Sequence, residues 1–268
     1  MKIGIIGFGY VGSAVAWAHR KHELVVIDPK LPDTASLSDL VGCDGIYVCV
    51  PSPPIDPTLE SGACDTSILE GVLKDLMFVN IANTVPVICK TTAPPRVYEQ
   101  LQKQYPNTVY CPEFLTARNH IADYMGAEYQ IIGGSDEWCE KAYPIITEGL
   151  PQLIDKVFYT DIKSAALYKY MMNSYLATKV TFMNDFKQLA DAEGVAWDEL
   201  RALTTYDTRI GQTHMDVPGP DGEYGWGGSC FPKDVAAIIE EAINHDLEFE
   251  LLQRVESINR THRRHNVR

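Results

Sequence analysis

The sequence predicts an α/β protein in which a doubly wound parallel sheet is followed by a long linking helix and a small all-helical domain. Short β-branched runs alternate with helical patterns over the first 160 residues, which is typical of strand–helix–strand units. From residue 161 to residue 193 neither proline nor glycine interrupts the chain, and helical patterns follow to the end. The change of pattern separates a first domain, residues 1–160, from a second, residues 161–268.

The expected strands are seven short apolar runs. They lie at Lys2–Gly7, Leu24–Ile27, Gly45–Val50, Val85–Lys90, Thr108–Cys111, Gln130–Gly133 and Lys156–Tyr159. A helix is expected between the first two, from about Val11 to Arg20. This alternation favours a sheet with helices on both faces.

One helix of about 50 Å is expected over Asp161–Glu193, given a rise of 1.5 Å per residue. Asp161 suits its N-cap, and Gly194 stands where a glycine ends a helix. Apolar residues recur along it at near-helical spacing, at Ala165, Tyr168, Met172, Leu176, Met183, Phe186 and Ala190. Further helices are expected at Trp197–Leu203, Val235–Asn244 and Phe249–Asn259, with a loop rich in glycine and proline over Gly211–Ser229.

The composition argues against several classes of protein. A net charge of −13 is unlike that of a nucleic-acid-binding protein, and we interpret the one basic cluster, Arg260, His262, Arg263 and Arg264, as a solvated helix end. No apolar stretch approaches the roughly 20 residues of a membrane span, and no signal peptide precedes the first strand. Seven scattered cysteines form neither a disulfide framework nor a paired metal site. We therefore expect a cytoplasmic enzyme without a metal.

A dinucleotide site is expected at the N-terminus. Gly7, Gly9 and Gly12 form GxGxxG between a strand and a helix, and Asp28 ends the next strand. Glycines there allow a tight turn and close approach to a pyrophosphate at the helix N-terminus. Asp28 would accept hydrogen bonds from both ribose hydroxyls and repel a 2′-phosphate, which favours NAD over NADP. The alternative is a glycine-rich turn without a ligand.

A candidate nucleophile lies in the segment GWGGSCFPKD, residues 225–234. Pro232 suits the first turn of a helix, so Cys230 is expected at a helix N-terminus beside Lys233, and both features favour the nucleophilic thiolate. Asp234 lies one helical turn beyond the cysteine. The alternative, a small buried hydrophobic residue, is our interpretation of Cys43, Cys49, Cys64, Cys89 and Cys139.

Lys169 and Asn173 are four residues apart on the long helix, hence on one face. An amine and an amide among apolar neighbours suggest a pocket, although a solvated lysine alone is the commoner outcome.

These features together resemble the UDP-glucose/GDP-mannose dehydrogenase family over nearly the whole chain. The matching segments are GFGYVG at residues 7–12, Tyr47–Val50 with Pro51-Ser52-Pro53, KTTAP at 90–94, PEFL at 112–115, LYKYMMNSYLATK at 167–179, Arg209-Ile210-Gly211 and the cysteine segment. The family is built on a Rossmann-like NAD domain, and GGSCFPKD is rarely met elsewhere.

The resemblance implies oxidation of a nucleotide-sugar C6 alcohol to the uronic acid, with two hydride transfers to NAD⁺ and a thioester on Cys230. Lys169 and Asn173 would stabilise oxyanions, and Asp234 would orient Lys169 and the attacking water. Glu113 would be the general base for hydrolysis, and Thr92 would hold a water. Arg209 would reach a bound sugar, often across a dimer interface.

The resemblance also implies two sets of binding residues. The cofactor would contact Gly7, Gly9, Tyr10, Val11, Gly12, Asp28, Val50, Pro51, Ser52, Thr92 and Lys233. The substrate would contact Phe114, Leu115, Lys169, Asn173, Arg209, Tyr224, Gly225 and Gly227. A homodimer is expected through the long helix, where Met171, Tyr175 and Phe182 widen the apolar surface.

The chain departs from the family pattern in three places. Ala117 replaces a second glutamate, which would slow hydrolysis or leave it to another base. The family typically continues through a third domain, so this chain is expected to be a naturally short form, a truncated form or a protein that a partner completes. The loop from Thr213 to Tyr224 also differs from the family loop that contacts the base, and the sugar and base are left open.

Two other functions compete with this one. A β-hydroxyacid or 6-phosphogluconate-type dehydrogenase shares the architecture and the Lys/Asn pair, but transfers one hydride without a cysteine. A non-catalytic NAD-binding relative is the second alternative.

Overall fold

The computed structural model describes residues 1–55, 62–79, 84–153 and 155–265. These residues divide into two compact units. Unit 1 holds Met1–Pro53 and Cys64–Lys169, and unit 2 holds Pro54–Ala63 and Tyr170–Arg268. The predicted domain boundary at residue 160 stays a prediction.

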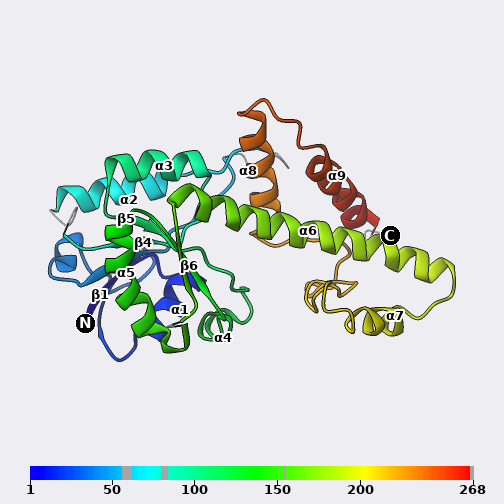
Figure 1. Ribbon diagram of the computed structural model, residues 1–268, viewed down its shortest axis with the longest axis horizontal. Helices are drawn as coiled ribbons and strands as arrows, with labels where there is room; N and C mark the ends of the chain where they lie inside the picture. Colours follow the sequence, from blue (N-terminus) through cyan, green and yellow to red (C-terminus); the bar gives the residue numbers. More distant parts are fainter. Residues whose placement is uncertain (56–61, 80–83, 154, 266–268) are drawn as a thin grey trace. The chain divides into compact units, whose positions relative to one another are not determined.

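Unit 1 contains one seven-stranded sheet, as predicted (Figure 1). Its strands are β1 (Lys2–Ile6), β2 (Glu23–Ile27), β3 (Gly45–Val48), β4 (Val87–Cys89), β5 (Thr108–Tyr110), β6 (Gln130–Gly133) and β7 (Val157–Thr160), in the order β2-β1-β3-β4-β5-β6-β7. Neighbouring strands are parallel except β5 and β6, which pair antiparallel where Tyr110 faces Gly133. The predicted doubly wound parallel sheet is therefore confirmed, with one antiparallel pair at β5 and β6.

Helices cover both faces of the sheet (Figure 1). Those of unit 1 are α1 (Tyr10–Ala18), α2 (Ser67–Phe78), α3 (Pro95–Gln104), α4 (His120–Met125) and α5 (Asp136–Gly149), with 3-10 turns at Leu37–Leu40 and Pro151–Leu153. Successive strand residues point to opposite faces. Ile46 and Val48 therefore pack with α2 and α3, whereas Tyr47 between them packs with α1, α4 and α5.

Helix α6 (Ile162–Ala192) is the long helix that the sequence predicts. Asp161 accepts hydrogen bonds from the Ser164 backbone N–H (2.9 Å) and hydroxyl (2.5 Å), and Gly194 has a φ of +69°, so both predicted ends are confirmed. Its first turns, with Ile162 and Ala165, belong to the core of unit 1.

Unit 2 is helical in the part of the chain that the structure describes, as the sequence predicts. Besides α6 it contains α7 (Trp197–Thr204), α8 (Phe231–Ile243) and α9 (Glu250–His265). A small core joins Met183 and Ala190 of α6 to Trp197, Met215 and Val217. No helix among the described residues is long and apolar enough to cross a membrane.

Helix α9 runs six residues beyond its predicted end, and the basic cluster there differs from the prediction. His262 is only 4% exposed, and Arg263 pairs with Asp221 at 2.8 Å. Arg260 pairs with Glu256 at 2.9 Å. The interpretation of this cluster as a solvated helix end is wrong for His262, because its ring packs against α6 and is desolvated.

Candidate functional site

The glycine turn after β1 is shaped for a close backbone approach. Gly7 has a φ of +90°, and its N–H donates to the Ile27 carbonyl (2.8 Å). A Cβ at Gly12 would lie 1.9 Å from the Gly7 carbonyl oxygen, so the first turn of α1 packs directly against the backbone of the glycine turn. A Cβ at Gly9 would meet nothing within 4 Å. The space beside Gly9, at the N-cap of α1, suits the pyrophosphate of a dinucleotide.

Asp28 follows β2 beside this turn. Its carboxylate accepts hydrogen bonds from the backbone N–H groups of Phe8 (2.6 Å) and Lys30 (2.8 Å), which lower the pKa of Asp28. The group is therefore held as an anion at the turn. An ionised acid fits the ribose diol of NAD and repels the 2′-phosphate of NADP.

Two loops that follow β3 and β4 are bonded to each other. The Ser52 hydroxyl donates to the Thr92 carbonyl (2.6 Å), and the Thr91 hydroxyl donates to the Val50 carbonyl (2.7 Å). Both loops leave the carboxyl ends of parallel strands, the edge at which open α/β sheets bind ligands. Val50, Pro51, Ser52 and Thr92 are thus brought together as a set.

Glu113 is the centre of a buried group in unit 1. One carboxylate oxygen accepts the Phe114 N–H (2.8 Å), and the other pairs with Lys90 Nζ at 3.5 Å. The Glu113 carbonyl oxygen accepts a hydrogen bond from Lys169, whose ammonium lies 4.7 Å from the centre of the Phe114 ring. The structure therefore brings Glu113, Phe114 and Lys169 together.

Lys90 is the member of this group that the sequence did not single out as a site residue. Its ammonium is buried and also donates to Cys111 Sγ (3.2 Å) and Gln130 Oε1 (3.4 Å). Burial alone would lower the pKa of Lys90, but the neighbouring Cys111, Glu113 and Tyr47 outweigh it and raise the pKa. Lys90 therefore stays a cation beside Glu113.

Cys230 forms the N-cap of α8 in unit 2 and is exposed, as the sequence predicts. Of the other six cysteines five are buried, and Cys49 is partly buried. Asp234, in the first turn of α8, is buried and bonded on both oxygens, to Asn173 Nδ2 (2.5 Å) and to Lys233 Nζ (2.5 Å). A thiol at a helix N-terminus is placed where an anion is stabilised.

Arg209 is bonded to a residue of its own turn. Its exposed guanidinium pairs with Asp207, two residues away. The turn after it is held by Lys179, which donates to the carbonyls of Ile210 (3.1 Å), Gly211 (3.2 Å) and Thr213 (2.5 Å). The sequence predicts no role for Lys179, because a lysine on a helix gives no indication of the loop that its side chain holds.

The remaining predicted residues lie on the segments already described. Tyr10 and Val11 open α1, Leu115 packs against the core of unit 1, and Tyr224, Gly225 and Gly227 belong to the loop before Cys230. Among the described residues no group of three or more His, Cys, Asp or Glu side chains could hold a metal ion.

Known proteins are similar to this chain along most of its length. The putative UDP-glucose 6-dehydrogenase YtcA of Bacillus subtilis is 28% identical over 97% of this chain and 68% of its own. A solved UDP-glucose dehydrogenase from Pyrobaculum islandicum superposes with a TM-score of 0.81 at 23% identity, covering 97% of this chain and 68% of that one. The chain thus spans about two thirds of the length of these relatives.

The fold is also shared with a shorter enzyme. Mycobacterium tuberculosis 3-hydroxyisobutyrate dehydrogenase superposes with a TM-score of 0.73 at 14% identity, covering 98% of this chain and 94% of that one, which shows likeness of fold alone. Two models of one family match the sequence itself, its NAD binding domain over residues 30–150 and its central domain over residues 163–261. The chain therefore belongs to the UDP-glucose/GDP-mannose dehydrogenase family, and its cofactor is NAD.

Proposed function

We propose that the chain oxidises the C6 alcohol of a nucleotide sugar to the carboxylate in two NAD-dependent steps, through a thioester on Cys230. The observation that carries this proposal is the exposed Cys230 at the N-terminus of α8, whose first turn also holds the buried Asp234–Asn173 pair. A dehydrogenase that stops at the aldehyde or ketone has no use for such a thiol. The names of the relatives support a UDP-sugar as substrate.

NAD, when bound, accepts a hydride from the substrate in each of the two oxidations. Between them the Cys230 thiolate adds to the aldehyde carbon, so that a C–S bond forms and the carbonyl oxygen becomes an oxyanion. Lys169 and Asn173, one turn apart on α6, supply an ammonium and an amide for that charge. The bond between Asn173 and Asp234 fixes the orientation of the amide.

Loss of the second hydride from the carbon of this adduct re-forms the C=O bond and gives the thioester, which is then hydrolysed. Water adds to the thioester carbon and the C–S bond breaks. The carboxylic acid is released, and Cys230 returns to the thiolate. Glu113 takes the proton from that water. The ammonium of Lys90, a buried cation, lies 3.5 Å from the Glu113 carboxylate that takes this proton. Position 117 is alanine here, so Glu113 works without a second acid at that position.

The test is a screen of UDP- and GDP-sugars for NADH release by the wild type and by Cys230→Ser. The proposal expects two NADH for each acid formed by the wild type, and no acid from the variant. A single-step dehydrogenase would give one NADH with or without the cysteine. A non-catalytic relative would bind NAD and release no NADH with any sugar.

We also propose that a second copy of this chain covers one exposed stripe of α6. The stripe consists of large apolar side chains three, four or seven residues apart, each 44–55% exposed, at Met171, Tyr175, Phe182, Phe186 and Leu189. Such a stripe is typical of a helix that pairs with another. Light scattering should give a dimer for the wild type and for the control Leu251→Glu on α9, and a monomer for Phe182→Glu. A monomeric wild type would contradict the proposal.

A further inference from the structure

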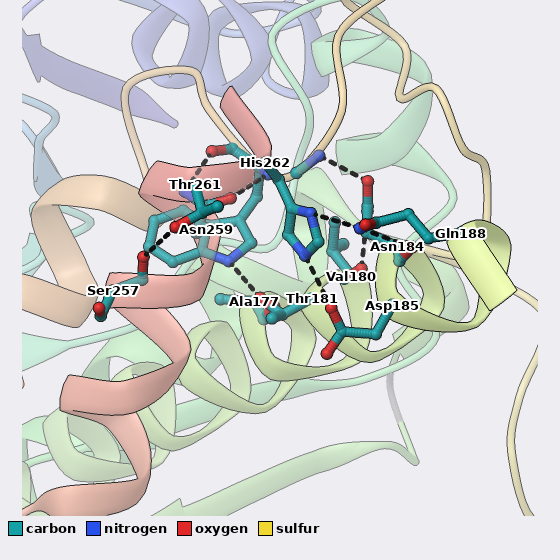
Figure 2. Close-up of polar contacts among 12 residues, drawn as sticks. Ala177, Val180, Thr181, Asn184, Asp185, Gln188, Ser257, Asn259, Thr261 and His262 are labelled. Atoms are coloured by element: carbon teal, nitrogen blue, oxygen red, sulfur yellow. Dashed lines mark hydrogen bonds and ion pairs between the residues drawn. The ribbon is translucent and has the colours of Figure 1, made fainter. Parts of the chain in front are cut away.

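The loop before Cys230 is fixed by side chains from two helices of unit 2, α6 and α9 (Figure 2). Asn259 and His262 of α9 lie beside Thr181, Asn184 and Gln188 of α6. Together these helices carry the groups that bond the Gly225–Trp226 backbone. None of these five residues belongs to the predicted catalytic or binding set.

The side-chain amide of Asn259 both accepts a hydrogen bond from the Trp226 backbone and donates one to it. Its Oδ1 accepts the Trp226 N–H (2.7 Å), and its Nδ2 donates to the Trp226 carbonyl (2.9 Å). The side chain is 6% exposed, so both bonds are made away from water. The amide thus pairs with the backbone of residue 226 as a residue of an adjacent strand would. Loss of either Asn259 Oδ1 or Nδ2 would leave a buried backbone group of Trp226 without a hydrogen bond.

Helix α6 holds the same two residues from another direction. Asn184 Oδ1 accepts the Gly225 N–H (2.8 Å), and the Trp226 indole donates to the Thr181 hydroxyl (2.9 Å). Asn184 is itself oriented by a bond from its Nδ2 to the Val180 carbonyl (2.8 Å). Residues 225 and 226 therefore have four hydrogen bonds to three buried side chains.

Two glycines allow α9 to come this close. Gly225 has a φ of +71°, and a Cβ there would lie 2.3 Å from Asn259 Oδ1. A Cβ at Gly227 would lie 2.1 Å from Arg263 Nη2, one helical turn further along α9. Gly225 of the GWGG segment is thus required in part by contact with Asn259 of α9.

Helix α9 is in turn held to α6. His262 Nε2 lies 3.1 Å from Asp185 Oδ1, and Gln188 Nε2 lies 3.0 Å from His262 Nδ1. These contacts fix the turn of α9 that carries Asn259 (Figure 2).

We propose that Asn259 is a positioning residue that presents Cys230 for attack on the substrate carbon. The inference rests on the proposed function. Trp226 is four residues before Cys230, and only Gly227, Gly228 and Ser229 stand between them. Such a segment is pliant, because two of its three residues lack a side chain. Fixing Trp226 shortens the free chain to three residues and confines the sulfur.

The first measurement is hydrogen exchange in the peptide that covers residues 225–230. Asn259→Leu removes both bonds to Trp226, and Asn259→Asp retains the acceptor but not the donor. Exchange should accelerate at least tenfold in Asn259→Leu and less in Asn259→Asp. Ser257→Ala, at an exposed position of the same helix, should leave it unchanged. Unchanged exchange in Asn259→Leu would overturn the anchoring.

The second measurement is the share of turnovers that end as a semicarbazone when semicarbazide traps free aldehyde. Misplacement of Cys230 slows its addition, so the trapped share should rise at least fivefold in Asn259→Leu. A merely structural role would lower the number of active molecules without moving this share. Should Asn259→Leu fail to fold, Asn259→Asp and Asn184→Ala carry the same test.

The two proposals fail in different ways. A wild type that makes acid, with an unmoved trapped share in folded Asn259 variants, overturns the positioning role alone. A wild type that releases no NADH with any nucleotide sugar overturns the proposed function and, with it, this role.

Discussion

Asn173 and Asp234 share a buried hydrogen bond of 2.5 Å although 61 residues separate them in the chain. The second oxygen of Asp234 pairs with Lys233, also at 2.5 Å. One carboxylate therefore fixes an amide of α6 against the first turn of α8, four residues after Cys230.

Replacing Asp234 by Asn should lower kcat for acid formation by about 10²–10³-fold, because the Asn173 amide loses its charged acceptor and no longer points at the oxyanion. Unpaired Lys233 should also lower the melting temperature. NADH release and thermal melting measure the two effects. Asp198→Asn, at an exposed position of α7, is the control. Near-normal kcat in Asp234→Asn would contradict an orienting role.

The glycine turn offers a matched pair of substitutions. Gly12→Ala should destabilise unit 1, because its Cβ would meet the Gly7 carbonyl oxygen. Gly9→Ala has open space and should retain the melting temperature, yet weaken NAD binding at least tenfold because its methyl occupies room needed by the pyrophosphate. Calorimetry with NAD measures both. Unweakened NAD binding by Gly9→Ala would place the cofactor elsewhere.

A double-mutant cycle on Lys90 and Glu113 should measure the interaction energy of this buried ion pair. Lys90→Met should lower the free energy of unfolding by about 3–5 kcal/mol, because it leaves the buried Glu113 carboxylate unpaired. Adding Glu113→Gln removes that charge and should recover part of the loss. Denaturant titration of the two single variants and the double variant measures the coupling. Strictly additive losses would show that the two groups do not interact.

His19 should make stability depend on pH. Burial, and then His22, Lys90 and the amino terminus, lower the pKa of His19 from 6.5 to about 4. Between these values the unfolded chain binds a proton that the folded chain does not, so stability falls as the pH falls through this window. The loss reaches about 3 kcal/mol.

Denaturant titration from pH 7.5 to pH 4.5 measures this loss. His19→Gln should flatten the dependence, whereas His245→Gln, at an exposed position, should not. An equal slope in wild type and His19→Gln would assign the loss to other groups.

The elements were predictable where one residue pattern decides them. Strand runs such as Gln130–Gly133 and the uninterrupted α6 depend on local sequence alone. The direction of β6 relative to β5 does not depend on local sequence, because an apolar run has the same pattern in either direction. The path of the chain before β6 sets that direction. Cys230 could be predicted because glycine, proline and lysine mark its helix start.

The partners of the site residues could not be predicted in the same way. Lys90 ends an apolar run, and a lysine there is ordinarily in water. Its burial depends on Cys111 and Glu113, which follow β5, and on Gln130 of β6, so its partners come from two later segments. Asn259 is one polar residue among many on α9, and only the approach of the glycine loop gives it a role.

The bonds between Trp226 and Asn259 also set an order of events during synthesis. Cys230 leaves the ribosome 29 residues before Asn259 does, so the nucleophile is made before the side chain that confines its loop. A nascent chain that pauses after α8 has only the two bonds from α6 to residues 225 and 226, and the two bonds from Asn259 form only when α9 docks. Any shortened variant that ends before residue 259 keeps the reactive cysteine but lacks the Asn259 side chain that fixes the loop before it.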